Sequence, residues 1–274
     1  MPQEKVGTVA ALWRYPVKSM LGEPLETSEV TTHGLLGDRA YALWDVERRR
    51  VASAKNPRRW KTLLDFQANY LAPPSPQATI PPVQVTLPDG AVVTSDTPDV
   101  DAIFSDALGR EVQMISSPPE AVSLDQYWPD VEGTAHQDAI TQLFLPEGTF
   151  FDSCPIHAIT TATLAKLQEL YPEGEFAASR FRPNLVIEPL AEARGFVEDD
   201  WVTGILQIGE QVRLQVDTPC PRCVVTTLAQ AGLPEDLNIL RTTARHHQVI
   251  AGIRASVIHG GTIRQNDLIW LEHG

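Results

Sequence analysis

The stretch Ile205–Cys223, Ile-Leu-Gln-Ile-Gly-Glu-Gln-Val-Arg-Leu-Gln-Val-Asp-Thr-Pro-Cys-Pro-Arg-Cys, carries both a fold signal and a candidate site. Two short apolar runs, Ile205–Ile208 and Val212–Val216, flank Gly209-Glu210, and this spacing predicts a β-hairpin. The second strand leads directly into a segment with two prolines and two cysteines. Because proline fixes the backbone and removes a hydrogen-bond donor, we expect a stiff loop that ends at Cys223.

Short apolar runs separated by turn signals also fill the first half of the chain and predict a β-rich region. The hairpin signal is strong at Pro88-Asp89-Gly90, because Asp-Gly supplies the positive φ angles of a tight turn between strands. A helix is expected at Asp99–Leu108, with Gly109 as its C-cap. The expected strands are Val6–Arg14, Leu25–Val30, Ala40–Trp44, Leu63–Leu71, Val83–Leu87 and Ala91–Thr94.

The second half of the chain mixes strands with helices. One helix is predicted over Ala162–Leu170, with Thr160-Thr161 as its N-cap, and a weaker one over Leu233–Thr243. Ser116–Pro129 contains adjacent prolines and is expected to be a connection, so the domain boundary is placed near residue 120. The further strands expected here are Pro155–Ile159, Leu185–Ile187, Ile253–Val257 and Leu268–Leu271, and Val224–Thr227 also resembles a strand.

These patterns predict a mainly β fold with a few helices, of the α+β class. Short strands with regularly spaced turns favour a barrel or a strongly bent sheet. The chain is expected to divide into a β-rich part, residues 1–120, and a mixed part, residues 121–274.

Composition and charge narrow the range of partners. Of the 274 residues, 43% are hydrophobic and 21% are charged, so a sizeable core can form. The net charge of −13 argues against generic binding to nucleic acid or to an anionic membrane. The N-terminus lacks the pattern of a signal peptide, and no run approaches the ~20 apolar residues of a membrane span. We therefore expect a cytoplasmic protein with reduced thiols.

One window departs from the acidic balance. Arg39–Lys61 contains eight basic and two acidic residues, which gives it a net charge of +6. Within this basic window, Arg39 is a candidate anion ligand, and Arg48-Arg49-Arg50 is expected in a solvated hairpin turn. Lys55–Lys61 is expected on a loop that rims a cleft or docks an acidic redox partner.

The two cysteines of Asp217–Cys223 admit several interpretations. Arg222 lies next to a thiol and would favour its thiolate form. A structural zinc site would need a second ligand pair, for which the histidines of the chain are poorly spaced. A thioredoxin-like redox pair would need a helix start rather than the strand-like residues that follow Cys223. Two inert core thiols remain possible, as does one thiolate that binds a cofactor metal or carries sulfur.

Other short motifs carry groups that suit an anion. Tyr15-Pro-Val-Lys18-Ser19 places an ammonium and a hydroxyl after the first strand, where together they can bind a phosphate. Gly34–Arg39 ends in an aspartate beside an arginine, and Arg180–Asn184 places Arg182 before a strand. Taken singly, these motifs are also typical of an exposed lysine, a surface ion pair and a turn. Asp152-Ser153 resembles a helix cap.

In their order along the chain, these motifs resemble the MOSC family, named for the C-terminal domain of molybdenum cofactor sulfurases. The motifs are Tyr15-Pro-Val-Lys-Ser19, Gly37-Asp-Arg39, Arg182-Pro-Asn184 and Cys220-Pro-Arg-Cys223. The resemblance extends from Val6 to Leu271 and is closest to the amidoxime-reducing branch, which pairs an N-terminal MOSC β-barrel region with the MOSC domain. It implies that residues 1–120 form an N-terminal β-barrel-like domain, which packs on a MOSC β-barrel domain formed by residues 121–274.

The resemblance also implies a molybdenum cofactor, the Mo-molybdopterin, and assigns residues to it. Cys223 would be the thiolate ligand of the metal and the catalytic residue. Cys154 stands where relatives carry a serine, and the resemblance assigns it no role. The implied cofactor contacts are Lys18, Ser19 and Arg39 at the pterin phosphate, Asp152 and Ser153 near the pterin, Arg182 and Asn184, and Pro221 and Arg222 beside the metal ligand.

The resemblance implies a reductase that removes oxygen from N-hydroxylated or N-oxide compounds at molybdenum. Electrons would come from a separate partner of the ferredoxin, flavin reductase or cytochrome type, because the three cysteines leave none for an iron–sulfur cluster. Two alternatives stay open: a sulfur carrier with a persulfide on Cys223 and without pyridoxal phosphate, and a protein that binds or delivers the cofactor. Val224–Gln230 departs from the family pattern, which leaves the substrate open.

Overall fold

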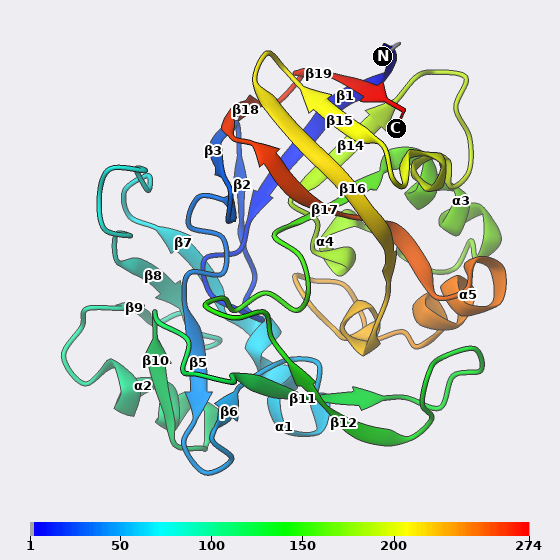
Figure 1. Ribbon diagram of the computed structural model, residues 1–274. Coiled ribbons are helices and arrows are strands. Elements are labelled where there is room, and N and C mark those ends of the chain that lie inside the picture. The colour runs from blue at the N-terminus through cyan, green and yellow to red at the C-terminus, as the bar shows by residue number, and fades with distance from the viewer. Residues whose placement is uncertain (1–2, 274) are drawn as a thin grey trace.

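The computed structural model describes residues 3–273, and its main feature is a closed β-barrel (Figure 1). Seven strands follow one another in the order β14-β13-β17-β16-β15-β19-β1, and β1 pairs with β14 to close the ring. Within this ring β13 and β14 run parallel, whereas the other pairs are antiparallel. The strands are β1 (Gln3–Arg14), β13 (Ile156–Thr160), β14 (Leu185–Pro189), β15 (Ile205–Ile208), β16 (Val212–Pro221), β17 (Ile250–His259) and β19 (Leu268–Glu272).

The barrel interior is filled by alternate apolar side chains of its strands. Val9, Leu12, Ile187, Leu214 and Ile269 belong to one continuous buried cluster. This packing explains the period-two apolar pattern of the strands, because successive side chains point to opposite faces of a sheet. The predicted hairpin around Gly209-Glu210 is confirmed as β15 and β16.

The first strand of the chain belongs to the barrel that the C-terminal half otherwise builds. β1 pairs with β14 on one side and with β19 on the other, while β2 (Glu23–Leu25) extends the sheet beyond the ring. The chain therefore leaves the barrel after Arg14 and returns to it at Ile156. The domain division at residue 120 stays a prediction.

Between these two points the chain builds small sheets around a second core. Phe66 and Phe104 are fully buried there, with ring centroids 6.1 Å apart. The predicted hairpin around Asp89-Gly90 is confirmed, and α2 (Val100–Leu108) ends at Gly109 with φ 63°. The sheets around this core are β5 (Ala42–Asp45), β6 (Arg50–Val51) and β10 (Val112–Ile115), and β7 (Gln67–Tyr70), β8 (Val83–Thr86) and β9 (Val92–Thr94). A third small sheet, β3 (Thr27–Thr31) and β4 (Gly34–Leu35) with β18 (Gly261–Arg264) from the C-terminal part of the chain, packs on the barrel core instead.

Two helices, α3 (Thr161–Leu170) and α5 (Asn238–His247), lie on the side of the barrel away from these small sheets (Figure 1). The predicted cap of α3 is confirmed, because Thr160 accepts a hydrogen bond from the backbone N–H of Thr163 at 3.1 Å. The helices are α1 (Pro57–Trp60), α3 (Thr161–Leu170), α4 (Ala178–Phe181), α5 (Asn238–His247) and the 3-10 turns η1 (Lys61–Asp65), η2 (Val197–Trp201) and η3 (Val224–Thr227). Across residues 3–273, no helix has the length and apolar character that crossing a membrane requires.

The mainly β fold class is confirmed, with 38% of the chain in strands and 19% in helices. Ser116–Pro129 was predicted to be a connection, and this prediction is wrong for the second half of the segment. Ser123–Trp128 forms β11, which pairs with β12 (Ala139–Phe144) in a separate hairpin. The strand expected at Leu63–Leu71 begins only at Gln67, because the preceding residues belong to η1.

The segment after the second cysteine of the Cys-x-x-Cys motif also differs from its predicted strand. Val224–Thr227 forms η3, a short 3-10 turn, although its β-branched residues favour a strand. Thr226 Oγ1 donates to the Cys223 carbonyl at 3.0 Å, and Thr227 Oγ1 donates to the Val224 carbonyl at 2.7 Å. These local hydroxyl contacts satisfy the turn, and Val224 and Thr227 are buried, so tertiary packing outweighs the strand propensity.

Candidate functional site

A single pocket brings together every candidate site residue that the sequence indicated. It lies between the barrel and the small sheets, has a cavity of about 130 Å³ and opens to solvent. The predicted residues that line it are Lys18, Ser19, Arg39, Asp152, Ser153, Arg182, Asn184, Pro221, Arg222 and Cys223.

One end of the pocket begins at the segment that follows β1. The buried Lys18 ammonium donates to the Phe150 carbonyl at 2.5 Å and pairs with Asp152 Oδ1 at 2.7 Å. Burial lowers the pKa of Lys18, and Asp152 opposes this effect by stabilising the charged form. Ser19 lies beside it, and its hydroxyl accepts the backbone N–H of Ala54 at 3.1 Å. These contacts hold an ammonium and a hydroxyl at the pocket wall.

Two arginines meet at the same buried tyrosine. The Arg39 guanidinium carbon lies 4.6 Å from the centre of the Tyr15 ring, and that of Arg182 lies 4.3 Å from it. Asp38 forms an ion pair with Arg39 and accepts the Tyr15 backbone N–H at 2.8 Å. Burial lowers the pKa of Arg182 to about 10, which leaves it charged at neutral pH. The ring thus holds two cations close together, where an anion can contact both.

Three of the residues proposed to bind an anion have a backbone in the left-handed region. Ser19, Arg39 and Arg182 have φ angles of 66°, 47° and 53°. Residues with a side chain adopt this region at a cost, and such strained positions cluster at ligand clamps. Arg182 Nη1 is also buried and has no hydrogen-bond partner among residues 3–273. An unpaired buried donor on a cation is costly, so this atom points to a ligand.

Asn184 lies at the pocket but is held by the protein itself. Its side-chain amide donates to Asp38 Oδ2 at 3.0 Å and to the Trp13 carbonyl at 3.4 Å, while its oxygen accepts the His157 N–H at 3.1 Å. Asn184 therefore joins β1, β13 and Asp38, and its predicted contact with a cofactor stays a prediction.

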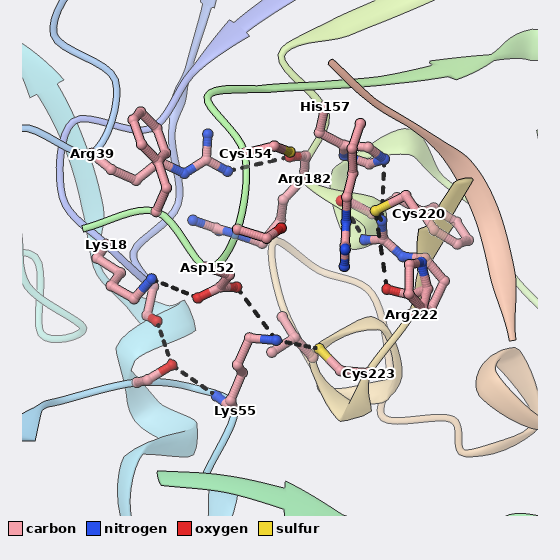
Figure 2. Close-up of a pocket in the computed structure, with 18 of the residues that line it drawn as sticks. Lys18, Arg39, Lys55, Asp152, Cys154, His157, Arg182, Cys220, Arg222 and Cys223 are labelled. Atoms are coloured by element: carbon pink, nitrogen blue, oxygen red, sulfur yellow. Dashed lines mark hydrogen bonds and ion pairs between the residues drawn. The ribbon is translucent and has the colours of Figure 1, made fainter. Parts of the chain in front are cut away.

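The other end of the pocket contains Cys223, which a line of charged groups connects to Lys18 (Figure 2). Asp152 pairs with Lys18 through Oδ1 and with Lys55 through Oδ2, the latter at 3.4 Å. Lys55 Nζ in turn lies 3.6 Å from Cys223 Sγ. Burial alone would raise the pKa of Asp152, but Lys18 and Lys55 outweigh it and hold that pKa well below its usual range. Asp152 is thus a carboxylate held between two lysine side chains.

Arg222 contacts the first cysteine of the Cys-x-x-Cys motif. Its Nη1 donates to Cys220 Sγ at 2.9 Å and lies 3.1 Å from His157 Nε2, and its Nη2 donates to the Phe181 carbonyl at 2.6 Å. Burial alone would raise the pKa of Cys220, but Arg222 and His157 lower it well below its usual value. Cys154 differs, because burial and the neighbouring Cys220 raise its pKa to about 11.

Several pocket residues were not among the predicted site residues. The sequence predicts for Lys55 only a place on a loop that rims a cleft. The one feature of the sequence that indicates a role for this lysine is its position in the basic window. His157 lies within a predicted strand and carries no local motif. Gly252 on β17 gives it room, since a Cβ there would come within 2.8 Å of His157 Nε2. The additional lining residues include Ser53, Lys55, His157 and Arg254.

Most basic side chains of the basic window form ion pairs with carboxylates. Arg59 pairs with Asp45 and Glu47 and is largely buried, whereas Arg58 pairs with Asp138 and stays 54% exposed. The predicted docking of an acidic partner at Lys55–Lys61 stays a prediction, and Arg58 is its more accessible arginine. The further ion pairs are Arg39–Asp38, Arg50–Asp125 and Lys55–Asp152.

The zinc interpretation finds no support in the described part of the chain. Among residues 3–273, no group of three or more His, Cys, Asp or Glu side chains is arranged to hold a metal ion. His247 instead pairs with Asp199 Oδ2 at 2.6 Å, and its ring stacks on Phe196.

Comparisons with known proteins agree with this fold. The family model described as the MOSC domain matches residues 146–270, and that described as the MOSC N-terminal beta barrel domain matches residues 6–111. The mitochondrial amidoxime-reducing component 1 of Homo sapiens is 30% identical over 245 residues, which cover 82% of this chain and 67% of the relative. Component 2 of the same organism is 28% identical over 237 residues, 82% of this chain and 68% of the relative.

A solved structure shows the same fold at low sequence identity. The YUAD protein of Bacillus subtilis superposes with a TM-score of 0.50 at 9% identity, over 100% of this chain and 98% of that one. At this identity the likeness concerns the fold alone.

Proposed function

Since the chain belongs to the MOSC family, in the amidoxime-reducing branch whose MOSC domain follows an N-terminal MOSC β-barrel domain, we propose that it is a molybdenum-cofactor-dependent reductase of N-hydroxylated or N-oxide compounds. The names of the relatives state the reduction of amidoximes, which are N-hydroxylated compounds. The observation that carries the proposal is a pocket with cations at one end and a cysteine sulfur at the other.

The donor set fits a pterin cofactor with a phosphate tail. Lys18, Ser19, Arg39 and Arg182 supply two kinds of cation and a hydroxyl, and Arg182 Nη1 is a buried donor without a protein partner among residues 3–273. These residues would hold the phosphate, because charge-assisted hydrogen bonds favour its oxygens. Cys223 would hold the metal, since a soft thiolate suits molybdenum. When bound, the cofactor supplies the centre that takes the substrate oxygen and exchanges electrons.

Residues of the chain would hold the side chains at both ends of the pocket in position. Asp152 pairs with Lys18 and Lys55 and would hold both side chains in place, although it adds a negative charge near the phosphate end. Lys55 donates to Cys223 Sγ and thereby orients this sulfur into the pocket. Arg222, held by Phe181 and His157, fixes the backbone beside Cys223. Phe151, Phe181 and Val225 give the same pocket an apolar wall that would accept the organic part of a substrate.

A separate protein would deliver the electrons. All three cysteines of the chain line the pocket, where Cys223 would bind the metal. A ferredoxin, a flavin reductase or a cytochrome would suit as the partner. A cytoplasmic location stays a prediction, and the names of the relatives place those proteins in mitochondria.

The test is reduction of benzamidoxime by full-length protein from a cofactor-competent host, with dithionite-reduced dye as the electron source. The proposal predicts turnover that depends on the molybdenum content of the sample. Wild-type protein that lacks molybdenum but holds a cyanide-labile sulfur on Cys223 would support the sulfur carrier instead. Stoichiometric molybdenum without turnover of any N-oxygenated compound would support a binding or delivery protein.

A further inference from the structure

We infer that Cys220 is a preformed thiolate and a site of oxidation by hydroperoxides on the wall of the pocket. This role is separate from that of Cys223 and does not depend on the proposed reductase function. The two cysteines lie in one short motif, but their sulfur atoms have different partners. Arg222 contacts the first one, whereas Lys55 contacts the second one.

The first observation is the geometry around the Cys220 sulfur. Arg222 Nη1 lies 2.9 Å from Cys220 Sγ, which is short for a hydrogen bond to sulfur. The guanidinium cannot swing away easily, because Phe181 accepts from Nη2 and His157 lies 3.1 Å from Nη1. A fixed cation in contact with sulfur stabilises the thiolate over the thiol.

Two arginines and a histidine ring face Cys220, and they come from more than its own segment. Arg222 belongs to the same loop, His157 comes from β13, and Arg254 comes from β17. The neighbouring Cys154 is the acidic group on this side of the pocket, and its raised pKa keeps it a neutral thiol at physiological pH. The surroundings of Cys220 therefore carry a net positive charge, in agreement with its lowered pKa.

Cys154 provides an internal reference for an unreactive thiol. Its S–H donates to the Ile156 carbonyl at 3.2 Å, and this hydrogen bond requires the proton to stay on sulfur. Both cysteines line the same pocket, so a reagent in the pocket meets both of them. Cys220 is only 7% exposed, which favours a small oxidant over a bulky one.

The reaction balances with a hydroperoxide as the oxidant. The Cys220 thiolate attacks the terminal peroxide oxygen, an S–O bond forms, and the O–O bond breaks. Sulfur is oxidised to a sulfenic acid, and the peroxide is reduced. The departing hydroxide or alkoxide takes one proton from solvent and leaves as water, or as an alcohol from an organic hydroperoxide. The product is neutral, so the ion pair with Arg222 is lost.

The experiment uses full-length protein produced in a host that does not make the molybdenum cofactor. The protein is treated with hydrogen peroxide, trapped with dimedone and mapped by peptide mass spectrometry. We expect label on Cys220 at a rate roughly tenfold or more above that on Cys154, since each pKa unit changes the thiolate fraction about tenfold. Cys154→Ser should keep the label on Cys220, and Arg222→Met should slow it, whereas Arg222→Lys should retain part of the rate.

A second readout does not need access to the pocket. The ultraviolet absorbance of thiolates is measured as a function of pH. The thiolate that forms at the lowest pH in wild type should be missing in Cys220→Ser and still present in Cys154→Ser. Preferential labelling of Cys154 or Cys223, an unlabelled Cys220, or a Cys220 thiolate that appears only in the ordinary range of a free cysteine would each overturn the proposal. Because all these samples lack the cofactor, failure here leaves the reductase proposal untouched.

Discussion

Lys55 Nζ lies 3.6 Å from Cys223 Sγ, although 168 positions separate the two residues in the chain. The contact joins the small sheets to the barrel at the point where the metal would bind. Asp152 pairs with both Lys55 and Lys18. One line of charged groups therefore runs through the pocket from Cys223 to Lys18 (Figure 2). We therefore infer for Lys55 a positioning role that its place in the basic window did not reveal.

Replacing Lys55 tests this role. Lys55→Met should reduce molybdenum content or turnover per molybdenum about 10-fold or more, the usual effect of removing a group that orients a metal ligand. Lys55→Arg should retain part of the function, because it keeps a cation near Cys223 and Asp152. Arg58→Met is the matched control, since Arg58 belongs to the same basic window but is 54% exposed and lies outside the pocket lining. Equal effects of Lys55→Met and Arg58→Met would refute the positioning role.

The second prediction concerns Tyr15, whose ring contacts the guanidinium groups of Arg39 and Arg182. Tyr15→Leu should weaken retention of the cofactor, measured as molybdenum that stays with the protein through gel filtration at increasing salt. Tyr15→Phe keeps the ring and should retain the cofactor, at a cost of about 1 kcal/mol in the free energy of unfolding for the lost hydrogen bond to Pro183. Similar losses of molybdenum in both variants would show that the aromatic ring does not organise the arginines.

The third prediction concerns a buried carboxyl of the 3-10 turn η2, which contacts the end of β13. Glu198 is 1% exposed and accepts the hydroxyl hydrogens of Thr160 and Thr163 at 2.6 and 2.7 Å. Burial raises its pKa, and the threonine hydrogen bonds only partly oppose this. A carboxyl whose folded-state pKa is raised favours folding below its unfolded-state pKa, and this contribution is lost as pH rises through the folded-state value.

Glu198→Gln removes this titration while it keeps an oxygen that can accept from both threonines. The free energy of unfolding of Glu198→Gln relative to wild type should therefore increase as pH rises from about 4 to neutrality. Urea unfolding at several pH values measures it. A difference between the two proteins that stays constant with pH would contradict the raised pKa.

Local sequence patterns were sufficient for the fold class and for the list of candidate residues. The turn chemistry at Asp89-Gly90 and Gly209-Glu210 predicted two hairpins that the structure contains. The four motifs of the family resemblance supplied residues that all line one pocket. Short-range signals of this kind depend on backbone preferences and on residue chemistry, which the sequence states directly.

Contacts between residues far apart in the chain could not be predicted from local sequence patterns. That β1 closes the barrel against β14 depends on packing between residues far apart, such as Val9 opposite Ile187. Arg222 is adjacent in sequence to Cys223, but its side chain contacts Cys220, because Phe181 and His157 hold the guanidinium on that side. Neither partner of Arg222 has a motif that pairs it with the cysteine loop.

The most direct test of the central claim is the molybdenum content of full-length wild type, Cys223→Ala and Cys220→Ala, all purified from a cofactor-competent host. Elemental analysis should find stoichiometric molybdenum in wild type, its loss in Cys223→Ala, and its retention for the most part in Cys220→Ala. Molybdenum that persists in Cys223→Ala while Cys220→Ala loses it would contradict the assignment of Cys223 as the metal ligand.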